Sequence, residues 1–141
     1  MSLPRDITYS KPTNLDDYTW LYALLRERLH RVGINISHRR LPSFDEHVRF
    51  WKSNPYRMVE IVRIGKRVAG YWCISNLGEI GIYLFEDCDT KEMSGAMLDR
   101  AIDVSGLDEF LVNVNPGNLN VIGALVERGF TVCQHTYRGT R

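Results

Sequence analysis

Apolar residues recur at helical spacing in the first quarter of the chain. Five of them stand at positions i, i+3, i+4, i+8 and i+11 and so share one helix face: Leu21, Leu24, Leu25, Leu29 and Val32. Thr13 or Asn14 can cap this helix, because a short polar side chain accepts hydrogen bonds from N–H groups of the first turn. Gly33 is suited to end it. A short strand, Ile7–Ser10, precedes the helix.

A second helix is predicted after an irregular stretch that runs to Pro42. Ser43 is its expected cap, and Glu46 stands three residues later, as in a capping box. Asn54-Pro55 ends it, because the residue before proline disfavours helical geometry.

Three apolar segments separated by short turns predict an antiparallel group of strands: Tyr56–Arg63, Val68–Ile74 and Glu79–Phe85. The third has little alternation, which indicates a central strand covered on both faces. A loop from Glu86 to Glu92 follows. The remaining elements are predicted to be a helix, a strand, a helix ending at Gly129 and a last strand: Met93–Val104, Glu109–Val114, Leu119–Arg128 and Val132–Tyr137.

The element order is therefore βααβββαβαβ, which predicts an α/β (α+β) fold with a mixed sheet and helices on both faces. The 141 residues correspond to one domain, 1–141. Hydrophobic residues make up 44% and charged residues 25%, which excludes a disordered or collagen-like chain. A net charge of +1 does not favour nucleic-acid binding. Apolar runs are too short for a transmembrane helix and no signal peptide is evident, so we expect no membrane contact and a cytoplasmic location.

The cysteines and histidines give no metal signature. Cys73, Cys88 and Cys133 are odd in number and show no CxxC spacing, and the four histidines form no HxxxH pair. We expect neither a metal site nor a disulfide framework.

The element order resembles that of the GNAT acyltransferases, a family that binds acetyl-CoA, over nearly the whole chain. Asn118 precedes Gly129-Phe130 by eleven residues, which resembles the family's N-x(10)-G-F segment after the fifth strand. Glu79-Ile-Gly-Ile-Tyr83 resembles the fourth strand, which pairs with pantetheine. The segments Ile36–His38, Leu41–His47 and Ser53–Arg57 resemble a subset associated with amino-sugar modification clusters and phage genomes. The resemblance implies a GNAT fold, with acetyl-CoA as co-substrate.

The family's phosphate loop, Q/R-x-x-G-x-G/A, matches this chain poorly. Its glycines bring N–H groups to the pyrophosphate at a helix N-terminus. An ungapped alignment places Asp89 at the basic position and Glu92 and Ser94 at the two glycines. With two residues inserted in the loop, Lys91 becomes the basic residue, while Ser94 begins and caps the helix and Gly95 permits close approach. The sequence does not choose between them, although the ungapped one needs no insertion. The implied cofactor-binding residues are Tyr83, Leu84, Lys91, Met93, Ser94, Gly95 and Asn118.

Two residues are candidates for proton transfer. Glu79 opens the strand where some family members place a general base, and Tyr83 is a substitute general acid. A substitute is needed because Leu125 stands where many members carry the acid tyrosine, seven residues after Asn118.

The resemblance implies that the region between the first two helices borders the acceptor site. The segment Arg26–Arg40 has five arginines and one glutamate, which suits an anionic acceptor such as a nucleotide-linked sugar. The candidate substrate-binding residues are His38, Arg39, Arg40 and Trp51.

Two function classes follow from these observations. The first is an acetyl-CoA-dependent N-acyltransferase that acetylates a primary amine of a small molecule, such as an amino sugar, by direct attack without an acyl-enzyme. The second is a catalytically degenerate GNAT fold that serves as a structural or interaction module, for example in a phage particle. The acidic loop and Leu125 favour the second class. Because only one strand follows the last helix, a neighbouring chain could complete the sheet in a homodimer.

Overall fold

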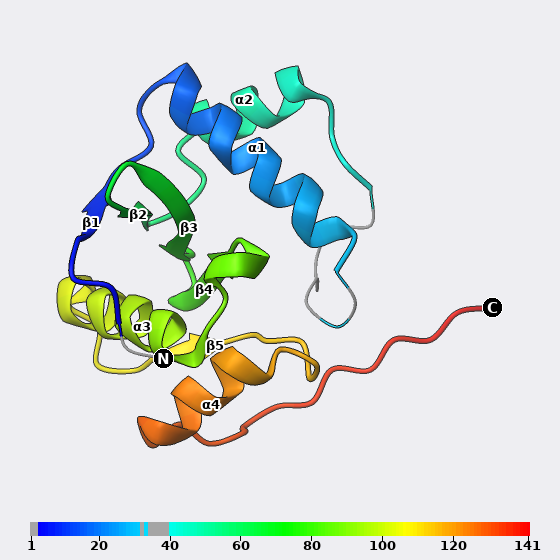
Figure 1. Cartoon of the computed structure of the whole chain (residues 1–141). Helices are drawn as coiled ribbons and strands as arrows, with labels where there is room; N and C mark the ends of the chain where they lie inside the picture. Colours follow the sequence, from blue (N-terminus) through cyan, green and yellow to red (C-terminus); the bar gives the residue numbers. More distant parts are fainter. Residues whose placement is uncertain (1–2, 32, 34–39) are drawn as a thin grey trace.

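A five-stranded sheet lies between two pairs of helices (Figure 1). The computed structural model describes residues 3–31, 33 and 40–141. Its elements, in chain order, are β1 (Ile7–Ser10), α1 (Leu15–Leu29), α2 (Phe44–Lys52), β2 (Met58–Ile64), β3 (Arg67–Ile74), β4 (Glu79–Leu84), η1 (Glu86–Cys88), α3 (Lys91–Ser105), β5 (Leu111–Val112) and α4 (Leu119–Glu127). The α/β class and the mixed sheet predicted from the element order are confirmed.

The strands follow one another in the sheet in chain order, β1-β2-β3-β4-β5. The first four are antiparallel neighbours, whereas β5 runs parallel to β4. The β4–β5 pairing is short, since it joins only Glu79 with Leu111 and Ile80 with Val112. The two strands are therefore paired at the beginning of β4 and unpaired along the rest of it.

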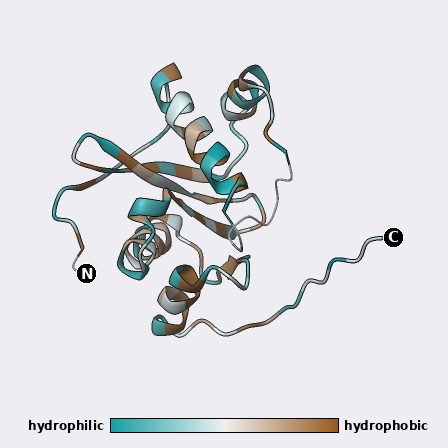
Figure 2. Ribbon diagram, turned by 45° about the vertical axis from the view of Figure 1, so that its right-hand side comes forward, coloured by the Kyte–Doolittle hydropathy of each residue, from teal (hydrophilic) through white to brown (hydrophobic). Residues whose placement is uncertain are grey.

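Each face of the sheet has its own apolar core (Figure 2). Ile80, Ile82 and Leu84 of β4 pack with α3 and α4, and Tyr83 packs on the opposite face against the cluster of α1 and α2. This alternation follows from the two-residue repeat of a strand. The predicted covering of the third strand on both faces is confirmed.

The helix starts are determined by local capping. The Asn14 side chain accepts a hydrogen bond from the Asp17 N–H at 2.9 Å, and the Ser43 hydroxyl accepts one from the Glu46 N–H at 3.1 Å. Both caps were predicted and are confirmed. At α3 the cap is Thr90, whose hydroxyl accepts from the Met93 N–H at 3.1 Å. The helix consequently begins at Lys91, two residues before the predicted start.

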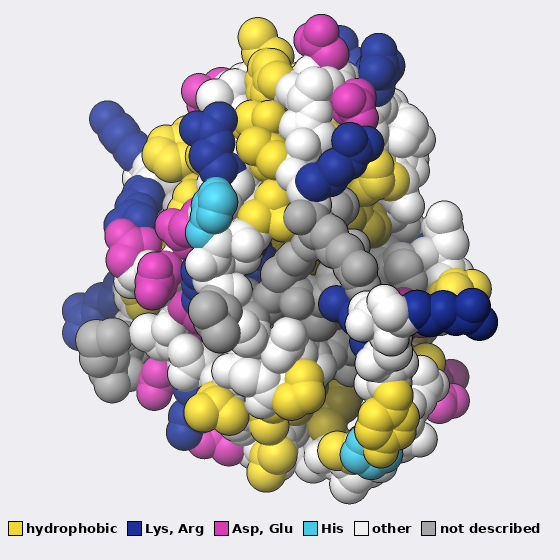
Figure 3. Space-filling view, turned by 90° about the vertical axis from the view of Figure 1, so that its right-hand side faces the viewer, with side chains coloured by type: hydrophobic (Ala, Val, Ile, Leu, Met, Phe, Trp, Pro, Cys, Tyr) yellow, Lys and Arg dark blue, Asp and Glu magenta, His cyan; other side chains and the backbone are white. Residues whose placement is uncertain are grey.

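The predicted last strand is wrong. Residues 131–141 form no strand and are exposed, and they lead away from the body (Figures 1 and 2). The predicted strand at 109–114 is reduced to Leu111–Val112. With so short a β5, its outer edge provides no ladder on which a further strand of the same chain could pair. Val132 and Tyr137 thus remain at the surface, where hydrophobic side chains are visible at several places (Figure 3).

Candidate functional site

A narrow cleft opens where β4 and β5 separate. Gly81, Ile82 and Tyr83 line it on the β4 side, and the 112–115 segment lines it on the β5 side. Asn118 and Val121 of α4 and Arg28 of α1 complete the lining. Its volume is about 20 Å³, room for roughly one water molecule. The site is therefore created by the separation of β4 and β5 and not by a surface loop.

Backbone N–H groups of β4 face the cleft. The Glu79 carbonyl accepts from the Ser75 N–H, and the Phe85 N–H donates to the Ala69 carbonyl, so the odd-numbered residues of this strand bond toward β3. Alternation directs the N–H groups of Ile82 and Leu84 the other way, toward β5. Since the β4–β5 ladder ends at Ile80, β5 does not pair with these two donors. A cleft with aimed N–H groups can hold a carbonyl oxygen and stabilise negative charge that develops on it.

This orientation affects two of the predicted cofactor contacts. Leu84 does not line the cleft, and its carbonyl accepts a hydrogen bond from Arg31 Nη1 at 2.9 Å. Tyr83 directs its carbonyl toward β3, close to Gly70, so its side chain rather than its backbone faces the cleft. Ile82 was missed by sequence reasoning. Residues of a strand direct their N–H groups alternately to the two neighbouring strands. Combined with the pairing of β3 and β4, this alternation identifies Ile82 as a residue whose N–H faces β5.

Tyr83 and Arg28 form the wall of the cleft on the α1 side. The Tyr83 ring lies over Gly81, where an added Cβ would be 2.6 Å from the ring. Tyr83 also stacks on Tyr71, with ring centroids 4.6 Å apart. The Arg28 guanidinium carbon lies 4.9 Å from the centroid of the Tyr83 ring. Burial raises the pKa of the Tyr83 phenol to about 12, so the phenol stays protonated near neutral pH and can donate a proton.

Asn118 supplies a buried polar atom at the floor of the cleft. Its Oδ1 is buried and accepts no hydrogen bond among the described residues. The side chain does not cap α4, although Asn118 occupies the N-cap position. An orphaned acceptor of this kind suits an amide N–H of a bound molecule.

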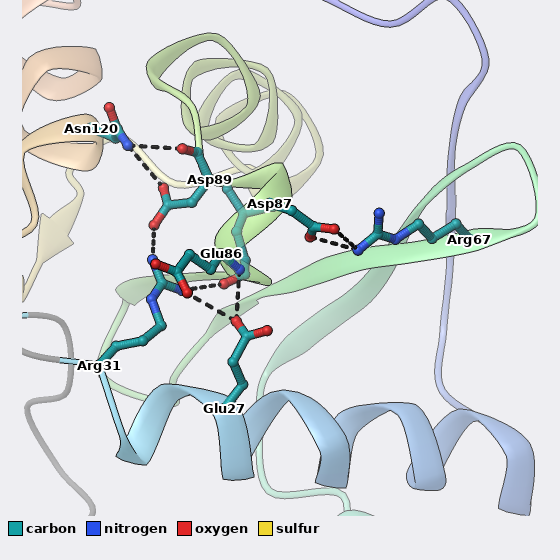
Figure 4. Close-up of polar contacts among 8 residues, drawn as sticks. Glu27, Arg31, Arg67, Glu86, Asp87, Asp89 and Asn120 are labelled. Carbon is teal, nitrogen blue, oxygen red and sulfur yellow. Dashed lines mark hydrogen bonds and ion pairs between the residues drawn. The ribbon is translucent and has the colours of Figure 1, made fainter.

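The acidic loop before α3 is held by ion pairs (Figure 4). Asp89 is buried and lies 2.5 Å from Arg31 Nη2, and its backbone carbonyl and Oδ1 accept from the Asn120 amide at 2.9 and 3.3 Å. The Glu86 N–H donates to Glu27 Oε1 at 2.6 Å. Asp87 pairs with Arg67 at the surface, and this hydrogen bond lowers the pKa of the Asp87 carboxyl. Asp89 therefore joins α1, the loop and the start of α4.

The shifted alignment of the phosphate loop is wrong about the start of the helix. Ser94 neither begins nor caps α3, because it is fully buried and its N–H donates to the Thr90 carbonyl. Met93 is a core residue whose N–H is used by the cap. An added Cβ at Gly95 would be 2.5 Å from the Arg128 guanidinium, so that side chain already covers Gly95. These three residues have structural roles here.

Lys91, at the start of α3, already has an ion-pair partner. Its Nζ lies 2.6 Å from Glu127 Oε1 of α4, and this hydrogen bond raises the pKa of the Lys91 ammonium. The N–H groups of Lys91 and Glu92 make no hydrogen bond among the described residues, so the helix retains two N–H donors in its first turn.

The three positions considered for proton transfer differ in their surroundings. Glu79 lies at the paired beginning of β4 and does not line the cleft. Leu125 packs into the core between the sheet and α4, so no proton donor stands at its position. Of the two proposed proton carriers, Tyr83 and Glu79, the structure brings only Tyr83 to the cleft.

The predicted acceptor residues are only partly described. His38 and Arg39 lie outside the described residues, and Arg40 is exposed. Trp51 is buried against Tyr56 and Tyr71, so the structure gives it a packing role rather than an exposed platform for a sugar. Arg28 belongs to the same basic segment and is the residue that reaches the cleft.

Two general features of the described residues concern metals and membranes. No group of three or more histidine, cysteine or carboxylate side chains is placed to hold a metal ion in the described part of the chain. Within the same residues, none of the helices has the length and apolar character needed to cross a membrane.

The comparisons with known proteins agree on the fold. No protein-family model matches the chain, and no curated protein matches it in sequence. One similar solved structure is that of yncA from Salmonella typhimurium, an inferred acetyltransferase solved with its cofactor acetyl-CoA. Its TM-score is 0.73 at 17% sequence identity, and the match covers 92% of this chain and 82% of that one. A domain from Methanocaldococcus jannaschii has a TM-score of 0.69 at 18% identity, over 92% and 91%.

A third similar structure is the microcin C7 self-immunity acetyltransferase MccE, solved with acetyl-CoA and AMP. Its TM-score is 0.64 at 16% identity, over 90% of this chain and 79% of that one. The chain therefore has the fold of the GNAT acetyltransferases. This conclusion follows from the similar structures, from the separation of β4 and β5, and from the helices on both faces of the sheet.

Proposed function

We propose that this protein is an acetyl-CoA-dependent N-acetyltransferase that acts on a primary amine of a small molecule. The observation that carries the proposal is the cleft between β4 and β5, toward which the N–H group of Ile82 is directed. Acetyl-CoA would supply an acetyl group activated as a thioester. Two proteins of similar fold, yncA and MccE, were solved with that molecule, which supports the choice of donor.

The residues of the cleft fit the thioester end of such a donor. The Ile82 N–H is the candidate for holding the acyl oxygen and stabilising the charge that develops on it during direct attack by the amine. Asn118 Oδ1 is the candidate acceptor for an amide N–H of the pantetheine arm. The Tyr83 phenol, which remains protonated, is the candidate for giving a proton to the departing thiolate.

The region that would bind the pyrophosphate of acetyl-CoA differs from a usual nucleotide-binding site. Two N–H groups of the first turn of α3 remain as donors, and the positive end of the helix dipole favours a phosphate there. Asp89 and Lys91, however, are already joined to Arg31 and Glu127. The pyrophosphate would consequently be held by backbone donors and by few basic side chains, which predicts weak binding of the donor.

Thermal melting with and without acetyl-CoA tests the proposal. A ligand at 100 times its dissociation constant stabilises by about 2.7 kcal/mol, which for a chain of this size raises the Tm by roughly 5–10 °C. Asn118→Ala should reduce that shift, because it removes the buried acceptor in the cleft. Asn76→Ala is the matched control, since Asn76 is exposed in the turn before β4. No shift at millimolar acetyl-CoA would refute the enzyme and favour a fold kept as an interaction module.

Two finer features belong to the same proposal. An amino sugar is a candidate acceptor, because the segments Ile36–His38, Leu41–His47 and Ser53–Arg57 resemble those of enzymes from amino-sugar clusters. A homodimer is the candidate assembly, because the exposed tail after Phe130 has no partner strand in its own chain and could pair as an edge strand with a second copy. Sedimentation equilibrium checks this directly, and a mass equal to one chain at micromolar concentration would contradict it.

A further inference from the structure

The guanidinium of Arg28 is a buried cation that has no hydrogen-bond or ion-pair partner among the described residues. It lies in the last turn of α1 and is 8% exposed. No hydrogen bond or ion pair joins its guanidinium to another described residue. Other arginines are paired with carboxylates: Arg31 with Asp89, Arg63 with Asp17, Arg67 with Asp87, Arg100 with Glu60 and Arg128 with Asp99. Asp17, another buried charged residue, has its partner in Arg63.

The guanidinium is directed at the candidate site. Arg28 lines the cleft between β4 and β5 and lies over the face of the Tyr83 ring. The neighbouring charges are those of Arg31 and Asp89, and Asp89 is already neutralised by its contact with Arg31. Burial lowers the pKa of the Arg28 guanidinium, which is the direction expected for a cation held away from water.

An unpaired charge in such a place is costly to the fold. Removing a guanidinium from water is unfavourable unless hydrogen bonds or an opposite charge replace the water. Contact with the Tyr83 ring compensates only in part, because a cation–π contact satisfies none of the five N–H donors of the group. A residue with a purely structural role at this position would not need to be charged.

We propose that Arg28 binds an oxyanion, a carboxylate or a phosphate, on the acceptor molecule of this site. The inference rests on the proposed acetyl transfer for the identity of the molecule as an acceptor. The planar guanidinium presents two parallel N–H groups, which match the two oxygens of either anion. With the anion held on the α1 side of Tyr83, the rest of the acceptor can extend toward Gly81 and Ile82. The substrate class is therefore an amine that also carries a negative charge.

The first test measures anion binding without acetyl-CoA. The Arg28 Nε–H resonance, assigned by its loss in Arg28→Gln, is followed by NMR during titration with inorganic phosphate and, separately, with acetate. We expect a saturable shift with one of them, and the anion that causes it distinguishes phosphate from carboxylate. Sodium chloride at the same ionic strength should not cause it. Absence of a saturable shift with both anions up to 50 mM would overturn the proposal.

The second test compares matched acceptors in the presence of acetyl-CoA. D-glucosamine 6-phosphate is compared with D-glucosamine, and L-alanine with L-alaninamide. The anionic member of one pair should have at least a tenfold higher kcat/KM, mainly through KM. Arg28→Gln should abolish the preference and Arg28→Lys should retain part of it. Arg26→Gln should leave it unchanged, because Arg26 is exposed on the same helix.

The two tests separate the inference from the proposed function. An anion that binds at Arg28 without any acetyl transfer would leave the anion site standing and refute the enzyme. Acetyl transfer that proceeds equally well on the neutral members, and is insensitive to Arg28→Gln, would refute the anion site and leave the enzyme standing.

Discussion

Replacing Asp89 by asparagine tests how strongly the acidic loop is joined to α1. The Asp89 and Arg31 side chains are 7% and 11% exposed, and the shortest distance between their charged atoms is 2.5 Å. Removing one partner of a buried ion pair typically costs about 3–5 kcal/mol, because the other charge is left buried and unpaired. Asparagine retains an oxygen that can accept from Asn120, so we expect the lower end of this range, about 3 kcal/mol.

A matched control lies two residues earlier in the same loop. Asp87 also contacts an arginine at 2.5 Å, but its side chain and that of Arg67 are 60% and 50% exposed. Water screens this pair, so Asp87→Asn should cost at most about 1 kcal/mol. The two substitutions make the same chemical change and differ mainly in burial.

Urea denaturation at pH 7, followed by fluorescence of the buried Trp51 and Trp72, measures both variants. With an m value of about 2 kcal/mol per molar, the Asp89 variant should unfold roughly 1.5 M earlier than the parent protein. The Asp87 variant should shift by less than about 0.5 M. Equal shifts in both variants would refute the argument that burial determines the strength of these pairs.

Three further predictions concern the cleft and the sheet and helices around it. Tyr83→Phe should lower kcat by about 10²- to 10⁴-fold with little change in Tm, if the phenol is the general acid; an unchanged kcat in steady-state assays would remove that role. Asp99→Asn should destabilise the protein at neutral pH. The hydrogen bond from Arg128 lowers the pKa of Asp99, so this contribution is present above the unfolded pKa of about 3.9 and is lost as pH falls through the lower folded value. Thermal melts at stepped pH should therefore converge for parent and variant in acid. Gly70→Ala should prevent stable folding, because the new Cβ would be 1.9 Å from the Tyr83 carbonyl oxygen; a circular dichroism melt close to that of the parent would contradict it.

Local signals explain why much of the fold was predictable. A cap needs only a short polar side chain three residues before the N–H that it accepts, so Asn14 and Ser43 were identified from their neighbours. The Leu21 and Leu24 positions follow from helical spacing alone and are buried as expected. The last strand failed for the opposite reason. Residues 132–137 have strand-like composition, but a strand also needs a partner, and the short β5 does not provide one.

The sequence by itself determined the class of fold, the order of the elements up to α4 and the region in which the site would lie. It could not distinguish Arg28 from Arg31, which are three residues apart in one basic segment. Only the tertiary structure decided that Arg31 meets Asp89, 58 residues away, while Arg28 faces the cleft without a carboxylate. The reason is physical: hydrophobic period and capping are encoded by neighbours in the chain, whereas the pairing of a charge depends on which distant groups folding brings within a few ångströms.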